Sequence, residues 1–265
     1  MERTHLLLIG VDGLRLDVLD LADLPALRRM LDGACTSMTM PAPTISGPCW
    51  STLLTGASVE QHGVVDNRFI GSRLALHPDL LTLAFLADPT RTTFAAAAWP
   101  PLVDPAGVGP VIRTRDDQRR LEQHRVVVRD GETYGYRVAD GEVAVFATAG
   151  VLAAGPDVAF VHFSSVDEAG HLFGARSAEY AAAARRVDGH LAGLLAAVEA
   201  RAGAGEHWLV AVTTDHGHLD GGGHGGAEPE VAASFVARMG FGVEPAGWPE
   251  EMPPTELTPR LLAAL

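Results

Sequence analysis

The sequence predicts an α/β fold, a doubly wound and mostly parallel sheet flanked by helices, with a small inserted cap. Short apolar runs recur along the chain and alternate with segments of helical spacing, and no repeat or low-complexity tract breaks this order. The clearest runs stop at polar residues, which is typical of buried parallel strands that deliver side chains to a sheet edge. The length of 265 residues suits one domain over 1–265.

Each element is predicted from a local pattern. Apolar runs predict strands at 6–11, 35–40, 92–99, 157–163, 208–213 and 231–237. Helical spacing predicts helices at 24–31, 47–54, 78–87, 141–154 and 256–265, together with a long helix that begins at Ser177.

The stretch 100–138 differs in composition, being rich in Pro, Gly, Arg and Asp. We expect it to form the cap, with a hairpin that pairs 126–129 with 134–138 around the turn at Asp130 and Gly131. Five arginines between residues 113 and 125 are expected to meet an anionic substrate. The alternative is a solvated surface loop.

Composition excludes several functional classes. All 20 basic residues are arginine, against 33 acidic residues, and the formal net charge is −13. The lack of lysine excludes a Schiff-base mechanism and a Walker-type phosphate site, and the acidic balance argues against nucleic-acid binding. Cys35 and Cys49 are too few for a disulfide framework or a four-thiolate zinc site. The apolar run at 6–9 is too short for a signal peptide or membrane span, which favours a cytoplasmic chain without a membrane partner.

Residues able to bind metal follow three of the predicted strands. Asp12 follows 6–11, and Asp167 and His171 follow 157–163. The strand at 208–213 leads into a glycine-rich stretch that holds Asp215, His216, His218, Asp220 and His224. A lone Asp after a strand is often a turn or cap residue, and Asp167 with His171 fits a surface pair equally well. Because glycines let side chains converge, the whole cluster predicts a site for Zn²⁺ or another divalent ion.

These ligands suffice for two ions, and paired ions assist phosphoryl transfer by binding the attacking and leaving oxygens. Such a site needs a nucleophile, and Ser46 lies just before a predicted helix, at the expected N-cap. The helix N-terminus offers N–H groups and positive potential to a phosphate oxygen. A metal on the serine oxygen would lower its pKa and replace a general base. The alternative is that Ser46 only caps the helix.

The motifs VDGLRLD, PTISGPCWSTLLTG, EQHGVVDN, VDEAGH, TTDHG and GGGHGG occur in this order between residues 6 and 226. The ordered set resembles the alkaline phosphatase superfamily, in particular its nucleotide pyrophosphatase/phosphodiesterase branch. The resemblance implies an alkaline-phosphatase-like sheet and two divalent ions, with Zn²⁺ expected first and Mn²⁺ as an alternative. It assigns one ion to Asp12, Ser46, Asp215 and His216, and the other to Asp167, His171 and His224. Ser46 matches the position of the catalytic Thr or Ser.

The resemblance also implies a reaction, phosphoester hydrolysis through a phosphoserine at Ser46. A nucleotide-like diester or pyrophosphate is the expected small-molecule substrate, and a phosphomonoester or a phosphonate is the alternative. A sulfatase is disfavoured because Trp50 stands where the sulfatase signature has arginine. A catalytically silent metal-binding protein is the alternative from another class, but no expected ligand is missing.

The roles of several further residues are less defined. The family has an Asn that contacts the phosphate after the nucleophile, and the nearest candidates are Cys49, a poor donor, and Asn67, which fits a turn cap equally well. His218 and Asp220 have no implied ligand role and fit either support of the ligands or surface exposure. Asp188 is expected to be a buried hydrogen-bonding group. The other histidines are expected to be structural or surface residues: His5, His62, His77, His124, His162, His190 and His207.

Overall fold

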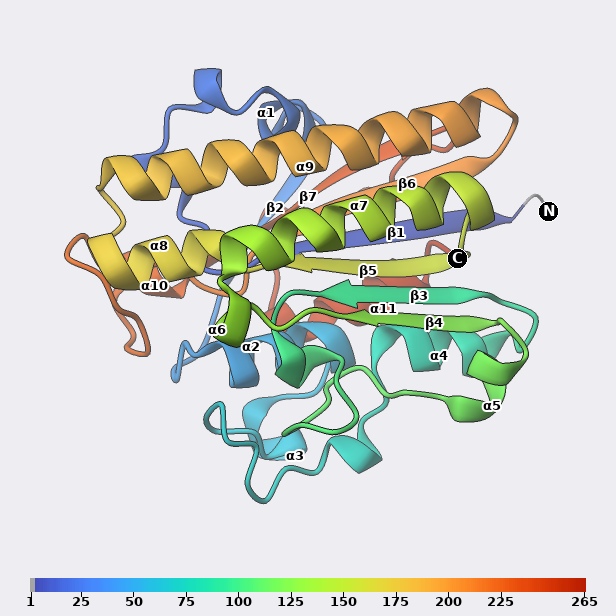
Figure 1. Cartoon of the computed structure of the whole chain (residues 1–265), viewed down its shortest axis with the longest axis horizontal. Helices are drawn as coiled ribbons and strands as arrows, with labels where there is room; N and C mark the ends of the chain where they lie inside the picture. The colour runs from blue at the N-terminus through green and yellow to red at the C-terminus, as the bar shows by residue number, and fades with distance from the viewer. Residues whose placement is uncertain (1–2) are drawn as a thin grey trace.

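A single sheet organises the molecule. The computed structural model describes residues 3–265, and within them seven strands pair in the order β2-β7-β6-β1-β5-β3-β4 (Figure 1). Neighbouring strands are parallel except for β7, which runs antiparallel to both β6 and β2. The predicted class, an α/β fold with a mostly parallel sheet, is therefore confirmed.

The strands form where apolar and β-branched residues cluster. Their bounds are β1 (Thr4–Val11), β2 (Ala34–Thr39), β3 (Thr93–Ala97), β4 (His124–Val128), β5 (Val158–Phe163), β6 (His207–Thr213) and β7 (Ala233–Phe241). The six predicted strands correspond to all of these except β4. The run predicted at 231–237 begins instead with the short helix α10 (Pro229–Ala232) before the chain becomes extended.

Helices cover both faces of the sheet (Figure 1). One face carries α1 (Pro25–Leu31), α7 (Tyr136–Ala154) and α9 (Ala178–Gly203), and the other carries α2 (Ser46–Thr55), α4 (Leu80–Ala87) and α11 (Leu257–Leu262). The remaining α-helices are α3 (Val59–His62), α5 (Asp116–Arg120), α6 (Gly131–Tyr134) and α8 (Ser165–Phe173). Among the described residues, no helix is both long and apolar enough to cross a membrane.

Two hydrophobic cores lie on the two faces of the sheet, because successive side chains of a strand point to opposite sides. In β1, Leu7 and Ile9 pack into the core beneath α1, α7 and α9, and Leu6 and Leu8 pack into the core beneath α2, α4 and α11. The four side chains have no exposed surface. This double burial explains why β1 is continuously apolar in the sequence instead of alternating.

The predicted hairpin in 100–138 is wrong. Its first half forms β4, which extends the main sheet by pairing parallel to β3, and its second half forms α6 and the start of α7. The Asp130 side chain accepts a hydrogen bond from Thr133 N and starts α6 instead of a two-residue turn. The Asp-Gly pair is common at helix starts as well as in hairpins, so the local pattern alone does not separate the two.

The carboxyl ends of the parallel strands meet at one edge of the sheet, next to α8 and α10 at the left of Figure 1. The register of β1 and β6 pairs Gly10 with Thr213, so Asp12 and Asp215 leave the sheet side by side two residues later. β5 pairs its last residue, Phe163, with Val11 and then leads into α8. Three segments distant in sequence thereby bring polar residues to one place.

Candidate metal and catalytic centre

Four predicted ligands form a compact buried set, which we call the first group: Asp12, Ser46, Asp215 and His216. Ser46 Oγ lies 3.4 Å from Asp12 Oδ1 and 3.4 Å from His216 Nε2. His216 Nε2 lies 3.3 Å from Asp215 Oδ2 and 3.6 Å from Asp12 Oδ1. Ligands held at 2.0–2.1 Å by a tetrahedral ion lie about 3.3 Å from one another, so these separations suit one ion.

The Asp12 carboxylate is held in place by residues whose function was missed in the sequence. Trp50 Nε1 donates to Asp12 Oδ2 at 2.9 Å, and His162 Nε2 lies 3.2 Å from the same oxygen. Oδ1 therefore remains directed toward Ser46 and His216. A Cβ at Gly10 would lie 2.4 Å from the Trp50 ring, so this glycine within a strand makes room for the indole. In the sequence, a glycine within an otherwise apolar strand was the available signal that a large side chain packs against it.

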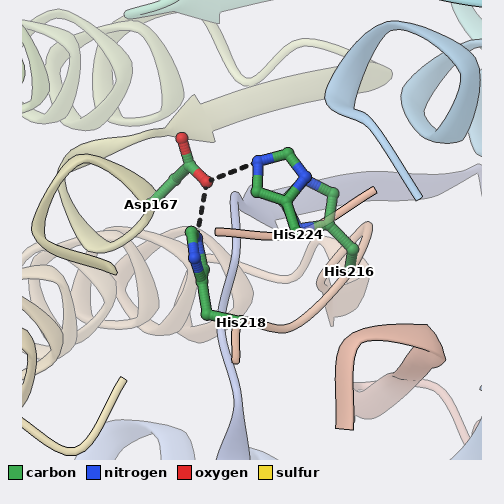
Figure 2. Close-up of side chains that lie close together, drawn as sticks. All are labelled: Asp167, His216, His218 and His224. Atoms are coloured by element: carbon green, nitrogen blue, oxygen red, sulfur yellow. Dashed lines mark hydrogen bonds and ion pairs between the residues drawn. The ribbon is translucent and has the colours of Figure 1, made fainter. Parts of the chain in front are cut away.

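The three ligands assigned to the other ion form the second group: Asp167, His171 and His224. Asp167 and His171 are four residues apart on α8 and therefore share one helix face, with Asp167 Oδ2 3.5 Å from His171 Nε2. His224 comes from the glycine-rich loop, and its Nε2 lies 3.6 Å from Asp167 Oδ1 and 2.9 Å from His171 Nε2. Figure 2 shows the side chains of Asp167 and His224 facing each other across this space.

The tautomer of His224 suits a metal ligand. Its Nδ1 lies 2.7 Å from the carbonyl oxygen of Thr44, which can only accept, so Nδ1 carries the proton. Nε2 then presents a lone pair toward His171 and Asp167. Burial lowers the pKa of His224 to about 3 and that of His216 to about 4, so both imidazoles are neutral at pH 7.

The electrostatics of the carboxylates favour a cation. Burial raises the pKa of Asp215 well above its usual value, and the charges of Asp12 and Asp167 raise it further. Burial and the Asp12 charge likewise raise the pKa of Asp167. Asp215 Oδ2 is buried without a hydrogen-bond partner among the described residues. Crowded carboxylates and an unpaired buried oxygen are stabilised by a positive ion, and the mixture of oxygen and imidazole ligands fits Zn²⁺ or a similar metal.

Ser46 is free to act as a nucleophile. The N-cap of α2 is Ile45, not Ser46 as predicted, and no side chain caps this helix. The Ser46 hydroxyl, which is nearly buried, instead faces Asp12 and His216. The interpretation of Ser46 as a simple capping residue is therefore wrong, because its oxygen is used at the site and not at the helix end.

The two candidate phosphate contacts differ. Asn67 lines the same cavity as Ser46, and its Oδ1 accepts from Gly47 N at 2.8 Å, which leaves its Nδ2 to donate. Cys49 is buried in α2 with its Sγ 3.8 Å from the carbonyl oxygen of Pro43, and it is not among the residues that line the cavity. Burial raises the pKa of the Cys49 thiol well above its usual value, so it is not a thiolate at pH 7.

The cavity over Ser46 has a volume of about 430 Å³. Beyond the metal ligands it is lined by Asn67, Trp99, Glu132, Tyr136, Ser164, Glu168 and Leu172. Residues 130–136 thus do reach the site, but the arginines expected there do not line it. Arg119 and Arg125 line a separate cavity of about 550 Å³ beside Thr93 and His124, where β3 and β4 begin. No sequence signal singled out Glu132, because its role depends on how α6 packs.

The structure shows the surroundings of three further residues that the sequence analysis placed outside the ligand sets. His218 is fully buried, with Nε2 2.7 Å from Asp167 Oδ1 (Figure 2). Asp220 is exposed and pairs with Arg15 and Arg176. Asp188 is buried and accepts from Leu27 N at 2.7 Å at the start of α1, which confirms its predicted structural role.

Comparison with solved structures supports the fold. Human ectonucleotide pyrophosphatase/phosphodiesterase 5 matches with a TM-score of 0.69 and 15% identity, over 98% of this chain and 94% of that one. The murine protein, an inactive variant in complex with AMP, matches with a TM-score of 0.59 and 20% identity, over 82% of this chain and 58% of that one. Phosphonoacetate hydrolase from Sinorhizobium meliloti, in complex with phosphonoformate, matches with a TM-score of 0.59 and 16% identity, over 82% of this chain and 57% of that one. The chain thus spans less than two thirds of the length of the latter two.

No curated protein sequence matches this chain significantly. The family model of type I phosphodiesterase / nucleotide pyrophosphatase, however, matches residues 6–226. That range includes both groups, Ser46 and all six motifs. The chain therefore belongs to the type I phosphodiesterase/nucleotide pyrophosphatase family, within the alkaline phosphatase superfamily.

Proposed function

We propose that this protein is a metal-dependent phosphoester hydrolase that cleaves nucleotide-like diesters or pyrophosphates, with Ser46 as nucleophile and two divalent ions as cofactors. The observation that carries the proposal is the position of Ser46 Oγ, 3.4 Å from both Asp12 Oδ1 and His216 Nε2 at the mouth of a cavity. Family membership supports the substrate class, and the oxygen and imidazole ligands support Zn²⁺ first and Mn²⁺ second.

In this mechanism the side chains of the first group hold the Ser46 oxygen toward the substrate phosphorus. Divalent ions bound there would stabilise the serine alkoxide and the charge on the phosphoryl oxygens. Ser46 Oγ loses its proton to solvent and forms a bond to phosphorus, the bond to the leaving oxygen breaks, and that oxygen takes a proton from solvent. For a nucleotide diester the adduct is a nucleotidyl-serine. Water then forms a bond to phosphorus and the bond to Ser46 Oγ breaks, which returns a proton to the serine oxygen and releases the phosphomonoester. Asn67 Nδ2 is placed to donate to a phosphoryl oxygen throughout.

A phosphonate hydrolase is the second candidate, favoured by the match to phosphonoacetate hydrolase, and a phosphomonoesterase is the third. The same nucleophile and ions serve all three reactions, so the cavity beyond the phosphoryl group decides among them. A catalytically silent metal-binding protein remains the contrasting proposal, but none of the expected ligands is missing from the sequence.

The test is a panel of chromogenic substrates offered to protein reloaded with Zn²⁺ or Mn²⁺: a nucleotide diester, a simple diester, a monoester and a phosphonate. We expect the nucleotide diester to have the highest kcat/KM. Acid quenching during turnover should trap the adduct on Ser46, which peptide fragmentation distinguishes from Cys49. No turnover of any substrate, or an adduct on Cys49, would overturn the proposal.

A further inference from the structure

His218 occupies a slot formed by two glycines of the other metal-binding segments. A Cβ at Gly13, just after Asp12, would lie 2.7 Å from His218 Nε2. A Cβ at Gly170, on α8 just before His171, would lie 2.7 Å from the same imidazole. The side chain is fully buried between them. The two glycines therefore leave space for this ring, and any larger residue at either position would occupy that space.

The contact that His218 makes from this slot is a hydrogen bond rather than a shared metal position. Its Nε2 lies 2.7 Å from Asp167 Oδ1, a separation that suits N–H donation to a carboxylate. His171 and His224 both line the cavity over Ser46, whereas His218 is not among the residues that line it. Figure 2 shows the imidazoles of His218 and His224 approaching the same oxygen of Asp167.

We propose that His218 is a positioning residue that donates its Nε2 proton to Asp167 Oδ1 and thereby fixes the carboxylate for the second ion. This inference rests on the two-ion site proposed above and assigns a role that the ligands alone do not define. With Oδ1 engaged, Oδ2 is held toward His171 Nε2, 3.5 Å away. Residues that orient a ligand in this way raise metal affinity without touching the metal.

The surroundings fix both the ring and its tautomer. Donation from Nε2 leaves the proton off Nδ1, and Nδ1 is buried without a hydrogen-bond partner among the described residues. The carbonyl oxygen of His218 accepts from Arg15 Nη1 at 2.9 Å, and Arg15 is itself held by Asp17 and Asp220. The main chain at His218 is therefore anchored on the side away from Asp167, and the ring has one polar contact to make.

The test is a Zn²⁺ titration of metal-free protein by calorimetry, which resolves the two sites without using turnover. We expect His218→Leu, which keeps bulk but removes the donor, to weaken the second site by about 10- to 100-fold and leave the first site unchanged. His218→Gln, whose amide nitrogen can replace Nε2, should restore the second site to within a few-fold. His62→Leu removes another buried, hydrogen-bonded histidine outside the site and serves as the matched control.

Gly170→Ala gives a test with His218 intact, because the added methyl displaces the ring. Gly170→Ala should selectively lower the Zn²⁺ affinity of the second site. Added to His218→Gln, it should lower this affinity by a smaller factor than it does in the wild type. This pair also decides the question if His218→Leu does not fold. An unchanged second site in Gly170→Ala and, where it folds, in His218→Leu, or an equal loss at both sites, would overturn the inference alone. A wild-type chain that binds only one ion would overturn the two-ion proposal as well.

Discussion

The two groups that meet at the carboxyl edge of the sheet are built differently. The first group lies at the ends of β1 and β6 and at the start of α2, and every member is buried. The second group lies on α8 and in the glycine-rich loop, and the His171 side chain is 48% exposed. Sheet register and buried neighbours fix the first group before any ligand arrives, whereas the second depends on a helix face, a flexible sequence and the support of His218.

This difference indicates a division of labour. The first group contains the proposed nucleophile and is buried, as precise placement of a reacting atom requires. The second group faces the cavity and the solvent, where a leaving group or an attacking water can enter. The predictions that follow test whether the two groups can be disturbed separately.

The largest expected effect comes from Ser46→Ala, which should lower kcat on the order of 10³-fold or more, because covalent catalysis is lost. The second group shares no side chain with Ser46, so its ion should remain. Ser51→Ala is the matched control, since Ser51 is buried one turn further along α2 and its hydroxyl donates to Gly47 O at 2.6 Å. Steady-state kinetics with metal analysis measure both quantities. Full activity in Ser46→Ala would contradict the assignment.

Removing one ligand from each group should abolish one ion at a time. Asp215→Asn is expected to empty the first site, and His171→Ala the second. Each variant should lower the metal affinity of its site by more than the 10- to 100-fold that is typical of supporting residues. Elemental analysis of reloaded variants should fall from two ions per chain to one in both. If either variant lost both ions while remaining folded by circular dichroism, the groups would form one coupled site instead of two.

Acid should release the ions from both groups. Each group contains a carboxylate whose pKa burial raises well above its usual value, Asp215 in the first group and Asp167 in the second. The pKa of Asp12 is instead held well below its usual value, because the hydrogen bond from His162 and the nearby His216 outweigh its burial. A proton competes with the ion for a carboxylate, so affinity falls as pH falls, and it falls first where the pKa is higher.

The imidazoles of His216 and His224, with pKa values of about 4 and 3, stay neutral until lower pH and do not add to this loss. Dialysis from about pH 8 to about pH 5 should therefore lower the metal content of both groups. Variant His171→Ala, which already lacks the second ion, should lose its remaining ion over the same range. A wild type that keeps two ions per chain at about pH 5 would contradict the prediction.

A smaller effect is expected from Trp50→Phe, which removes the N–H that orients Asp12 but keeps most of the ring. Affinity of the first site should fall roughly tenfold, with the second site unchanged. An unchanged first site would mean that the indole acts through packing and not through its hydrogen bond to Asp12. Two-site calorimetry gives the answer.

The smallest effect is expected outside both groups. Glu132 lines the cavity and accepts from Trp99 Nε1 at 3.2 Å. Glu132→Gln should change KM a few-fold among diesters that differ in their leaving group, with metal content and kcat for a simple diester unchanged. The matched control is Glu142→Gln on α7, where the carboxylate pairs with Arg129 away from this cavity. Identical KM values across the panel would exclude a contact with the leaving group.

The sequence by itself determined the sheet class and identified the six carboxylate and imidazole side chains proposed as ligands. Apolar strands followed by Asp or His reveal both at once, because parallel strands of an α/β sheet end at a common edge. Ser46 was also predicted, although its placement at the N-cap was wrong by one residue. These features depend on local pattern and chain order, which a sequence displays directly.

Tertiary structure alone decided which residues support the ligands. Trp50, His162 and His218 act through contacts across 38, 150 and 51 residues of chain, and no local pattern fixes such distances. The stretch 124–128 became a parallel edge strand and not half of a hairpin, because pairing with β3 offered its backbone a partner that a short turn did not. Arg119 and Arg125 line a cavity where β3 and β4 begin, separate from the cavity that Ser46 lines. The chemical type of a side chain, which the sequence shows, decides whether it can bind a metal. Which residues support it depends on proximity in space, which only the folded structure creates.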